Sequence, residues 1–342
     1  MKYFRLIMPL IAAFFFFACS APEARHLSDS ARYFSVTDGP AGVVVRISSP
    51  FDGTTDSLVV SDPMKSIVCM STTMVAAFEQ LGRTDVVTGV SGKNYVTDPR
   101  ISENPYVAEV GFDSALDYET MLSLNPDLVL AYAVSSVEPP YVQKLRSLGV
   151  KVLMVYDNFE SHPLARAEYI RLCAALTAER DKADSIYASV SSSYYKAMDD
   201  VRSNDVKVMI NAPYGDAWYV PGKDSYMSRL VSDAGGVLLG SEDGLESSLI
   251  SLETAYGFSR EADVWLNPGI ADIKETLIAM HPLFIEFCRD GLRIYNNTLR
   301  KNSEGGNDFY ESGAMRPDLI LKDLISIFSG NASDLEYHIE VE

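Results

Sequence analysis

Few side chains in this sequence have the types and spacing that enzymes use for catalysis. The chain holds four histidines, His26, His162, His281 and His338. We expect His26 and His338 in terminal segments, and two interior histidines cannot supply a three-histidine zinc or manganese site. The sequence contains no HExxH, G-x-S-x-G, Walker A or CxxC pattern. We therefore expect no enzymatic activity, and no metal or cofactor held by the protein's own side chains.

Two glutamates, Glu119 and Glu253, occupy matching places in two similar segments. Residues 116–120 (LDYET) precede 127–130 (DLVL), and residues 250–254 (ISLET) precede 263–266 (DVWL). In each segment we expect Asp117 or Ser251 as a helix N-cap, with the glutamate in the first turn. A glutamate there offsets the helix dipole by roughly 0.3–1 kcal/mol, which is enough to explain one such residue. Its recurrence in both halves of the chain leaves a paired role open.

These segments belong to two runs in which short strands alternate with helices. The expected strands of the first run are 67–70, 86–90, 128–132 and 150–155, and those of the second are 206–210, 264–266 and 293–295. The expected helices are 72–81, 116–124, 141–148, 226–234, 252–258, 274–287 and 317–328. Strands that alternate with helices predict a parallel sheet covered on both faces. The chain is therefore predicted to form two α/β lobes.

A long helical segment separates the two runs. Residues 164–202 carry a helical pattern with a break near Leu176 and Thr177. In the second part, apolar residues from Ala183 to Val201 recur at three- and four-residue spacing, and no Gly or Pro interrupts them. At about 1.5 Å per residue this helix runs on the order of 35 Å, so it predicts a rigid connection between the lobes. Residues 33–60 alternate loosely around two turn signals and predict strands and hairpins.

The N-terminus has the features of an exported lipoprotein. Lys2 and Arg5 precede an apolar run, residues 6–17, that is too short to span a bilayer. The run ends in Phe16-Phe17-Ala18-Cys19, which resembles a bacterial lipobox, with Phe16 in place of the more usual Leu. The alternative is an ordinary signal peptide with a coincidental cysteine. We favour lipidation of Cys19, a flexible tether over residues 20–32, and a periplasmic, membrane-anchored protein.

The overall charge excludes one class of partner. The 342 residues carry a formal net charge of −18. Such a surface repels nucleic acid, because nucleic acid binding relies on Lys and Arg contacts to phosphates.

Three further cysteines, Cys69, Cys173 and Cys288, are expected to be small buried apolar residues, since an odd number cannot all pair within the chain.

Together, these features resemble a known family, the substrate-binding proteins of ABC importers for iron-siderophores, haem and vitamin B12. The resemblance covers roughly residues 63–330. It rests on residues 66–73 with 81–82 and 87–90, on 125–129, on 145–152, on the stretch from 220–222 to 234–236, and on 316–318. Each segment alone is weak evidence for the family, and the resemblance rests on their order and spacing together.

The family implies two Rossmann-like lobes joined by one long α-helix, with a ligand held between them. With the N-terminal β-hairpin extension, this gives the organisation that we expect. The expected segments are a signal peptide (1–19), a tether (20–32), N-terminal strands (33–62), an N-terminal lobe (63–176), a linking helix (177–203), a C-terminal lobe (204–330) and a tail (331–342).

The resemblance also implies roles for particular residues. One glutamate on each lobe docks onto arginines of the permease, and the matching residues here are Glu119 and Glu253. Ligand residues come from loops that follow the strands. The candidates in the two lobes are Lys93, Asn94, Tyr95, Phe112, Tyr132, Tyr214, Trp218, Tyr219, Phe309, Tyr310 and Arg316. Aromatic rings suit a large planar ligand, and Lys93 and Arg316 could pair with its carboxylates. Each ring could equally be core packing, and Arg316 could bridge locally to Asp318.

We therefore expect a monomer that captures an iron chelate, such as a siderophore or haem, or else cobalamin. It would deliver this ligand to a permease dimer with its ATPase. Two alternatives remain at this point. One is a chelatase-like or cofactor-handling enzyme on the same two-lobed fold, although the sequence supplies neither the histidines nor the cluster-binding cysteines of such proteins. The other is a surface lipoprotein that binds protein or glycan.

Overall fold

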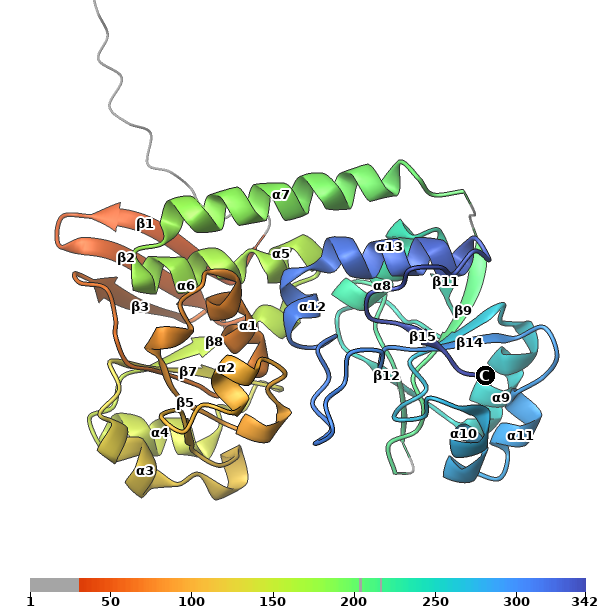
Figure 1. The fold of residues 1–342 in the computed structure, drawn as a ribbon, viewed down its shortest axis with the longest axis horizontal. Coiled ribbons are helices and arrows are strands. Elements are labelled where there is room, and N and C mark those ends of the chain that lie inside the picture. The colour runs from red at the N-terminus through yellow and green to blue at the C-terminus, as the bar shows by residue number, and fades with distance from the viewer. Residues whose placement is uncertain (1–30, 203–204, 216) are drawn as a thin grey trace, which may run out of the picture.

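The computed structural model describes residues 31–202, 205–215 and 217–342. Two α/β lobes lie side by side, and one long helix runs along both of them (Figure 1). The prediction of two lobes joined by one helix, with an N-terminal β-hairpin extension, is confirmed. The proposed lipidation residue, Cys19, and the predicted tether up to residue 30 lie outside the described residues.

The N-terminal lobe is built on a five-stranded parallel sheet with strand order β6-β5-β4-β7-β8. Its strands are β4 (Ile67–Cys69), β5 (Val87–Val90), β6 (Ala108–Glu109), β7 (Leu128–Tyr132) and β8 (Val152–Val155). Its helices are α1 (Thr72–Gln80), α2 (Pro99–Ser102), α3 (Tyr118–Leu124), α4 (Pro140–Ser147), α5 (Pro163–Ala167) and α6 (Tyr169–Thr177). Short 3-10 helices are η1 (Thr84–Val86), η2 (Lys93–Tyr95), η3 (Asp113–Ala115) and η4 (Asp157–Phe159).

The two faces of this sheet have separate cores. Ile67 and Cys69 face one apolar cluster, and Val68 and Met70 face the other, as the two-residue period of a strand requires. Because both faces are covered, the strands are apolar throughout rather than alternating.

The C-terminal lobe has a second five-stranded sheet with strand order β11-β9-β13-β14-β15. Its strands are β9 (Val206–Ile210), β11 (Gly236–Leu238), β13 (Val264–Leu266), β14 (Arg293–Asn296) and β15 (Ile339–Glu340). A separate antiparallel pair consists of β10 (Trp218–Val220) and β12 (Ser248–Ile250). The helices are α8 (Tyr226–Asp233), α9 (Leu252–Glu261), α10 (Lys274–Met280), α11 (Phe284–Phe287), α12 (Ser312–Met315) and α13 (Pro317–Phe328).

The predicted tail is a part of this lobe, which corrects the boundary at residue 330. Strand β15 pairs antiparallel with β14, and His338 is 1% exposed. The Asp323 carboxylate of α13 accepts hydrogen bonds from the backbone N–H groups of Glu336, Tyr337 and His338 at 2.8–3.1 Å. The helix therefore holds the last segment against the sheet, although β15 is too short to show a sequence pattern.

The linking helix α7 (Arg180–Met198) begins after a left-handed residue, Ala178, close to the predicted break. Near its start, Lys182 Nζ donates to the carbonyl of Leu81 in the N-terminal lobe at 2.8 Å. Near its end, the Tyr194 hydroxyl donates to Asp233 in α8 at 2.7 Å. One apolar core runs continuously from the N-terminal strands through α6 and α7 to the C-terminal lobe. We therefore expect limited movement between the lobes.

The N-terminal extension is a three-stranded antiparallel sheet of β1 (Phe34–Gly39), β2 (Gly42–Ser48) and β3 (Thr55–Val60). Phe34 packs against Tyr169 of α6, with ring centroids 4.6 Å apart. Two buried glutamates bind the backbone directly before the first strand of this sheet. Glu160 accepts hydrogen bonds from the backbone N–H groups of Arg32 and Tyr33, and Glu168 accepts one from Ala31. The sheet is thereby fastened to the N-terminal lobe.

Candidate functional site

The candidate site is the cleft between the lobes. Parallel strands place their carboxyl ends at one edge of a sheet, and ligands of open α/β sheets bind beyond that edge. Two cavities between the lobes are lined by the loops that follow these strands. We call them the tyrosine pocket, of about 690 Å³, and the phenylalanine pocket, of about 450 Å³.

The tyrosine pocket faces Tyr95 of the N-terminal lobe and Tyr310 of the C-terminal lobe, whose side chains are 46% and 51% exposed. The Tyr310 hydroxyl accepts a hydrogen bond from Asn297 Nδ2 at 3.1 Å. Four asparagines of the C-terminal lobe also line the pocket: Asn267, Asn297, Asn302 and Asn307. The pocket therefore offers two rings and several uncharged amides.

A loop of the C-terminal lobe reaches across to Tyr95. Asn302 Nδ2 donates to the carbonyl of Asn94 at 2.9 Å. A Cβ on Gly306 would lie 2.0 Å from the carbonyl oxygen of Tyr95, so only glycine permits this approach. The Tyr95 ring packs at a tilt against Phe112, with centroids 6.2 Å apart. The two lobes thus jointly fix the position of Tyr95.

Lys301 is the single basic residue among the described residues that line the tyrosine pocket. Its amine forms an ion pair with Asp272, whose other carboxylate oxygen accepts a hydrogen bond from the Thr298 hydroxyl at 2.5 Å. The charge of Lys301 is therefore already balanced within the protein. An anionic ligand would have to compete with Asp272 for it.

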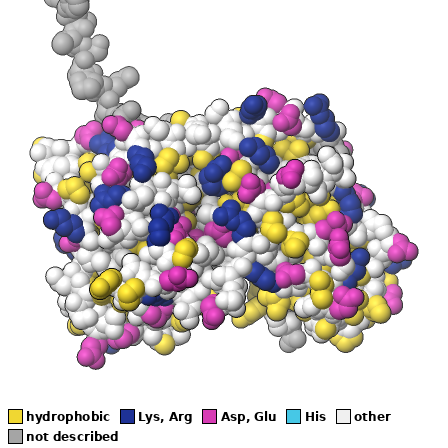
Figure 2. Space-filling view, in the orientation of Figure 1, with side chains coloured by type: hydrophobic (Ala, Val, Ile, Leu, Met, Phe, Trp, Pro, Cys, Tyr) yellow, Lys and Arg dark blue, Asp and Glu magenta, His cyan; other side chains and the backbone are white. Residues whose placement is uncertain are grey.

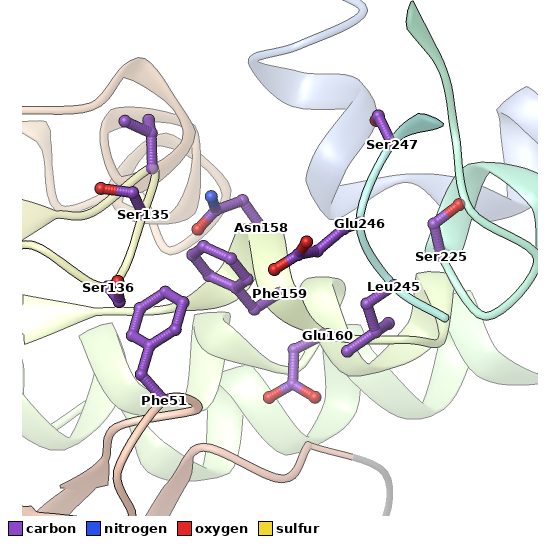
Figure 3. Close-up of a pocket in the computed structure, with 11 residues that line it drawn as sticks. Phe51, Ser135, Ser136, Asn158, Phe159, Glu160, Ser225, Leu245, Glu246 and Ser247 are labelled. Atoms are coloured by element: carbon purple, nitrogen blue, oxygen red, sulfur yellow. The ribbon is translucent and has the colours of Figure 1, made fainter. Parts of the chain in front are cut away.

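The phenylalanine pocket is built from the N-terminal sheet and from loops of both lobes (Figure 3). Phe159 and Asn158 follow β8, and Ser135 and Ser136 follow β7. Leu245, Glu246 and Ser247 come from the C-terminal lobe. Phe51 comes from the connection between β2 and β3 in the N-terminal sheet. No Lys or Arg is among the described residues lining this pocket.

The two cations proposed for ligand binding are held elsewhere. Lys93 Nζ donates to the carbonyls of Asn104 and Val107 at 2.5 and 2.8 Å, so its amine closes a loop of its own lobe. Arg316 forms a bidentate pair with Asp318, with Nε–Oδ1 and Nη2–Oδ2 distances of 2.9 and 3.0 Å. Neither residue lines either pocket of the cleft. For Arg316, the local alternative that the sequence left open is the one observed.

Two predicted aromatic ligand residues are core residues. Trp218 is 2% exposed, stacks on Trp265 and donates from Nε1 to the carbonyl of Ile210 at 2.9 Å. Phe309 is 4% exposed and packs against Tyr337 and His338. The prediction that they line the cleft was wrong. In each case the next residue in the sequence, Tyr219 or Tyr310, is the exposed one.

The remaining predicted residues line neither pocket. Tyr214, Tyr219 and Phe112 are 88%, 48% and 50% exposed, and Asn94 is also exposed. Tyr132 is partly buried at the end of β7, where burial and the nearby Asp113 carboxylate raise the pKa of its hydroxyl. Among the predicted residues, the structure therefore brings Tyr95 and Tyr310 together across one pocket.

Sequence reasoning missed Phe51, Phe159 and the asparagines. Phe51 directly precedes the Asp52-Gly53 turn signal, in a segment assigned only to strands. The asparagines were visible as a cluster, since four of them stand between residues 296 and 307, directly after a predicted strand. That density is the signal that could have located the tyrosine pocket.

The paired glutamates lie where the sequence placed them along their helices. Asp117 Oδ1 accepts from the backbone N–H groups of Glu119 and Thr120, and Ser251 Oγ accepts from Thr254 N–H at 3.1 Å. Both Glu119 and Glu253 are exposed in first turns, and helices α3 and α9 lie away from α7 (Figure 1). The predicted caps are confirmed, and the docking role stays a prediction.

Within the described residues, no group of three or more His, Cys, Asp or Glu is placed to hold a metal ion. Helices of sufficient length and apolar character to cross a membrane are likewise not found there. Cys69 and Cys173 are buried, Cys288 is partly buried, and all three are free thiols.

Two α/β lobes that enclose a cleft and share a linking helix define a class of solute-binding protein. Residues 67–276 match the periplasmic binding protein family, and the chain belongs to it. An uncharacterized lipoprotein of Methanocaldococcus jannaschii is 23% identical over 308 residues, covering 82% of this chain and 71% of that protein. An uncharacterized ABC transporter substrate-binding lipoprotein of Bacillus subtilis is 26% identical over 186 residues, covering 53% of this chain and 57% of its own length.

Solved structures share the fold. A periplasmic heme binding protein from Pseudomonas aeruginosa has a TM-score of 0.62 at 17% identity, covering 82% of this chain and 98% of that chain. The periplasmic vitamin B12 binding protein of Vibrio cholerae has a TM-score of 0.57 at 13% identity, covering 78% and 98%. At such identities these structures establish the fold and leave the ligand to be argued from the cleft.

Proposed function

We propose that this protein is the substrate-binding component of an ABC importer, anchored outside the cytoplasmic membrane through Cys19. It captures a metal chelate between its lobes and delivers it to the permease. The observation that carries the proposal is the cleft itself, where loops of both sheets meet around two pockets in a chain of the periplasmic binding protein family. The lobes share a core, so capture requires only modest closure.

The lining of the cleft favours an uncharged ligand. The rings and amides of the tyrosine pocket match a large ligand with apolar faces and amide groups. Lys301 is paired with Asp272, and the phenylalanine pocket has Glu246 on its wall. The carboxylates of haem or of an anionic siderophore would therefore meet little compensating charge. Among the three ligand classes that the family resemblance implies, cobalamin, with its many amides, fits best.

Calorimetric titration of the mature protein with cyanocobalamin, haemin and a ferric hydroxamate siderophore tests this function. We expect saturable binding of one cyanocobalamin per chain, and weaker binding of haemin. A protein that binds none of the three probes would disprove the metal-chelate function. Tighter binding of haemin than of cyanocobalamin would contradict the charge argument alone.

Docking on the permease is tested separately with Glu119→Arg combined with Glu253→Arg. If these carboxylates pair with permease arginines, the double variant loses uptake in cells while its affinity for ligand in solution is unchanged. Glu275→Arg is a matched control, because Glu275 is also exposed in the first turn of a helix of the C-terminal lobe, α10. Uptake that survives the double reversal rules out the docking role.

A further inference from the structure

The connection between β2 and β3 has a fixed shape that presents Phe51. The Asp52 carboxylate accepts hydrogen bonds from the backbone N–H and the hydroxyl of Thr54, at 3.1 and 2.8 Å. Ser49 Oγ accepts from the N–H of Phe51 at 3.3 Å, and the loop turns at Gly53 with φ of 69°. This loop lies outside residues 67–276, the part that matches the family. Its contribution to the cleft is therefore a feature of this chain's N-terminal extension.

Phe51 packs edge-on against the N-terminal lobe while part of its ring stays open. Its centroid is 4.9 Å from that of Phe159, at an interplanar angle of 81°, and 6.2 Å from that of Tyr156. The side chain is still 38% exposed. In Figure 3 the rings of Phe51 and Phe159 stand together at one side of the pocket. Such an arrangement leaves a ring free for a further stacking partner.

The opposite wall comes from the C-terminal lobe. Leu245 and Glu246 face the two rings across the pocket, and Ser247 follows them along the same segment (Figure 3). Around the rings, Ser135 and Ser136 supply hydroxyls. Asn158 Nδ2 donates to the carbonyl of Ala133 at 3.1 Å, which orients its amide. The pocket therefore combines an apolar base, a polar rim and two carboxylates, those of Glu160 and Glu246.

Ion pairs hold the N-terminal sheet beside this pocket. Arg146 of α4 pairs with Asp56 of β3 at 3.6 Å and with Glu138 at 2.6 Å. Glu138 lies in the same connection after β7 as Ser135 and Ser136. The loop that carries Phe51 and the loop that forms the polar rim are therefore joined through one arginine. On the other side, the sheet is packed into the core through Val45 and Ile47.

We propose that the N-terminal sheet forms a third wall of the ligand site and that Phe51 contacts the bound ligand. The portion of the ligand held there is uncharged and partly aromatic, and carries groups that hydrogen-bond to the serines and Asn158. This inference rests on the proposed function, because it assumes that the cleft is the ligand site. It assigns a ligand-binding role to a segment outside the family match.

The test compares Phe51→Ala with wild type by calorimetric titration with cyanocobalamin. Loss of one stacking ring predicts an affinity about tenfold weaker. Phe51→Trp keeps a ring and should stay near the wild-type affinity. Tyr106→Ala is the matched control, since Tyr106 is an aromatic residue of the N-terminal lobe that is 89% exposed and lines neither pocket. Thermal melting of each variant shows whether it is folded.

The outcomes separate this inference from the proposed function. If wild type binds cyanocobalamin and Phe51→Ala binds it equally well, the third wall is wrong and the importer function stands. A folded Phe51→Ala that loses affinity, with Phe51→Trp and Tyr106→Ala unaffected, supports the contact. If Tyr106→Ala weakens binding as much as Phe51→Ala does, the effect is not a contact in the pocket, and the inference fails. If wild type binds none of the three probes, both proposals fail.

Discussion

The cleft and a second groove lie between the same two lobes, but they hold different side chains. We call the second one the charged groove. It has a volume of about 790 Å³, and its charged lining residues are Glu79, Asp98, Arg100, Arg300, Asp308 and Arg316. Basic and acidic side chains are interspersed over the face of the molecule seen in Figure 2. The two pockets of the cleft instead present mainly rings, hydroxyls and amides, with one lysine that is already paired and two glutamates, Glu160 and Glu246.

Each arginine of the charged groove forms an ion pair with an aspartate. Arg300 Nη2 lies 2.9 Å from Asp308, Arg316 pairs with Asp318, and Arg100 pairs with Asp98. Across the lobe boundary, the Thr97 hydroxyl of one lobe donates to Asp308 of the other at 3.2 Å. The difference indicates that the arginines of the groove pair within their own lobes, with the Thr97–Asp308 contact across the boundary. In the cleft, rings, hydroxyls and amides predominate.

The largest expected effect is on ligand affinity when the rings of the cleft are removed. Tyr95→Ala combined with Tyr310→Ala should weaken cyanocobalamin binding about a hundredfold, because each ring contributes roughly a factor of ten. The free energy of unfolding should fall as well, since about half of each side chain is buried, so melting must show that the variant is folded at the titration temperature. Calorimetry and thermal melting measure the two quantities. Tyr214→Ala, at a residue that is 88% exposed and lines neither pocket, is the control. An equal loss in that control would place the ligand outside the tyrosine pocket.

Arg316→Ala should show the reverse behaviour, with a loss of stability and no loss of affinity. The variant leaves Asp318, which is 1% exposed, without its bidentate partner. Removing hydrogen bonds to a charged group costs about 2 kcal/mol, so the free energy of unfolding should fall by about that amount. Urea unfolding measures it. If Arg316→Ala instead weakened ligand binding at unchanged stability, the division between groove and cleft would be wrong.

The same division explains which parts of the site were predictable from sequence. The sheets and the linking helix could be predicted, because buried parallel strands and a long amphipathic helix have distinct apolar patterns. The loops and the short strand β10 were not, because neighbouring residues there point to opposite sides. In β10 Trp218 is buried and Tyr219 exposed, and in the loop before α12 Phe309 is buried and Tyr310 exposed. An aromatic residue after a strand therefore identifies the region of a cleft but not the ring that faces it.

Pairing partners distant in sequence were also beyond prediction. Nothing near Lys93 in the sequence shows that its amine closes onto the carbonyls of Asn104 and Val107. Likewise, Phe51 enters the cleft because the N-terminal sheet packs on the N-terminal lobe, through contacts such as Phe34 with Tyr169 and Arg146 with Asp56. Arg316 was the easier case, since Asp318 stands two residues away. A lysine or arginine predicted to bind ligand can thus be paired with protein groups that only the fold brings close to it.

The smallest expected effect is a pH dependence of stability that originates in Glu79, which lines the charged groove, and in Glu311, which is buried beside Asp308. Burial raises the pKa of Glu79 to about 8 and that of Glu311 to about 7, and the carboxylates of Asp98 and Asp308 nearby add to both shifts. Arg100 beside Glu79 acts in the opposite direction. In the unfolded chain both groups return to the ordinary value of 4.5. The folded protein therefore binds more protons between about pH 4.5 and pH 8, and the free energy of unfolding must fall as the pH rises through this range.

Glu79→Gln combined with Glu311→Gln should flatten that fall, because glutamine cannot titrate. Some slope should remain, since burial also raises the pKa of Glu160 to about 7. Urea unfolding at a series of pH values measures the slope, and Glu103→Gln, at an exposed carboxyl of the N-terminal lobe, is the control. Affinity for cyanocobalamin should not change, because neither glutamate lines the cleft. A double variant with the wild-type slope would mean that both carboxyls are ionised at neutral pH.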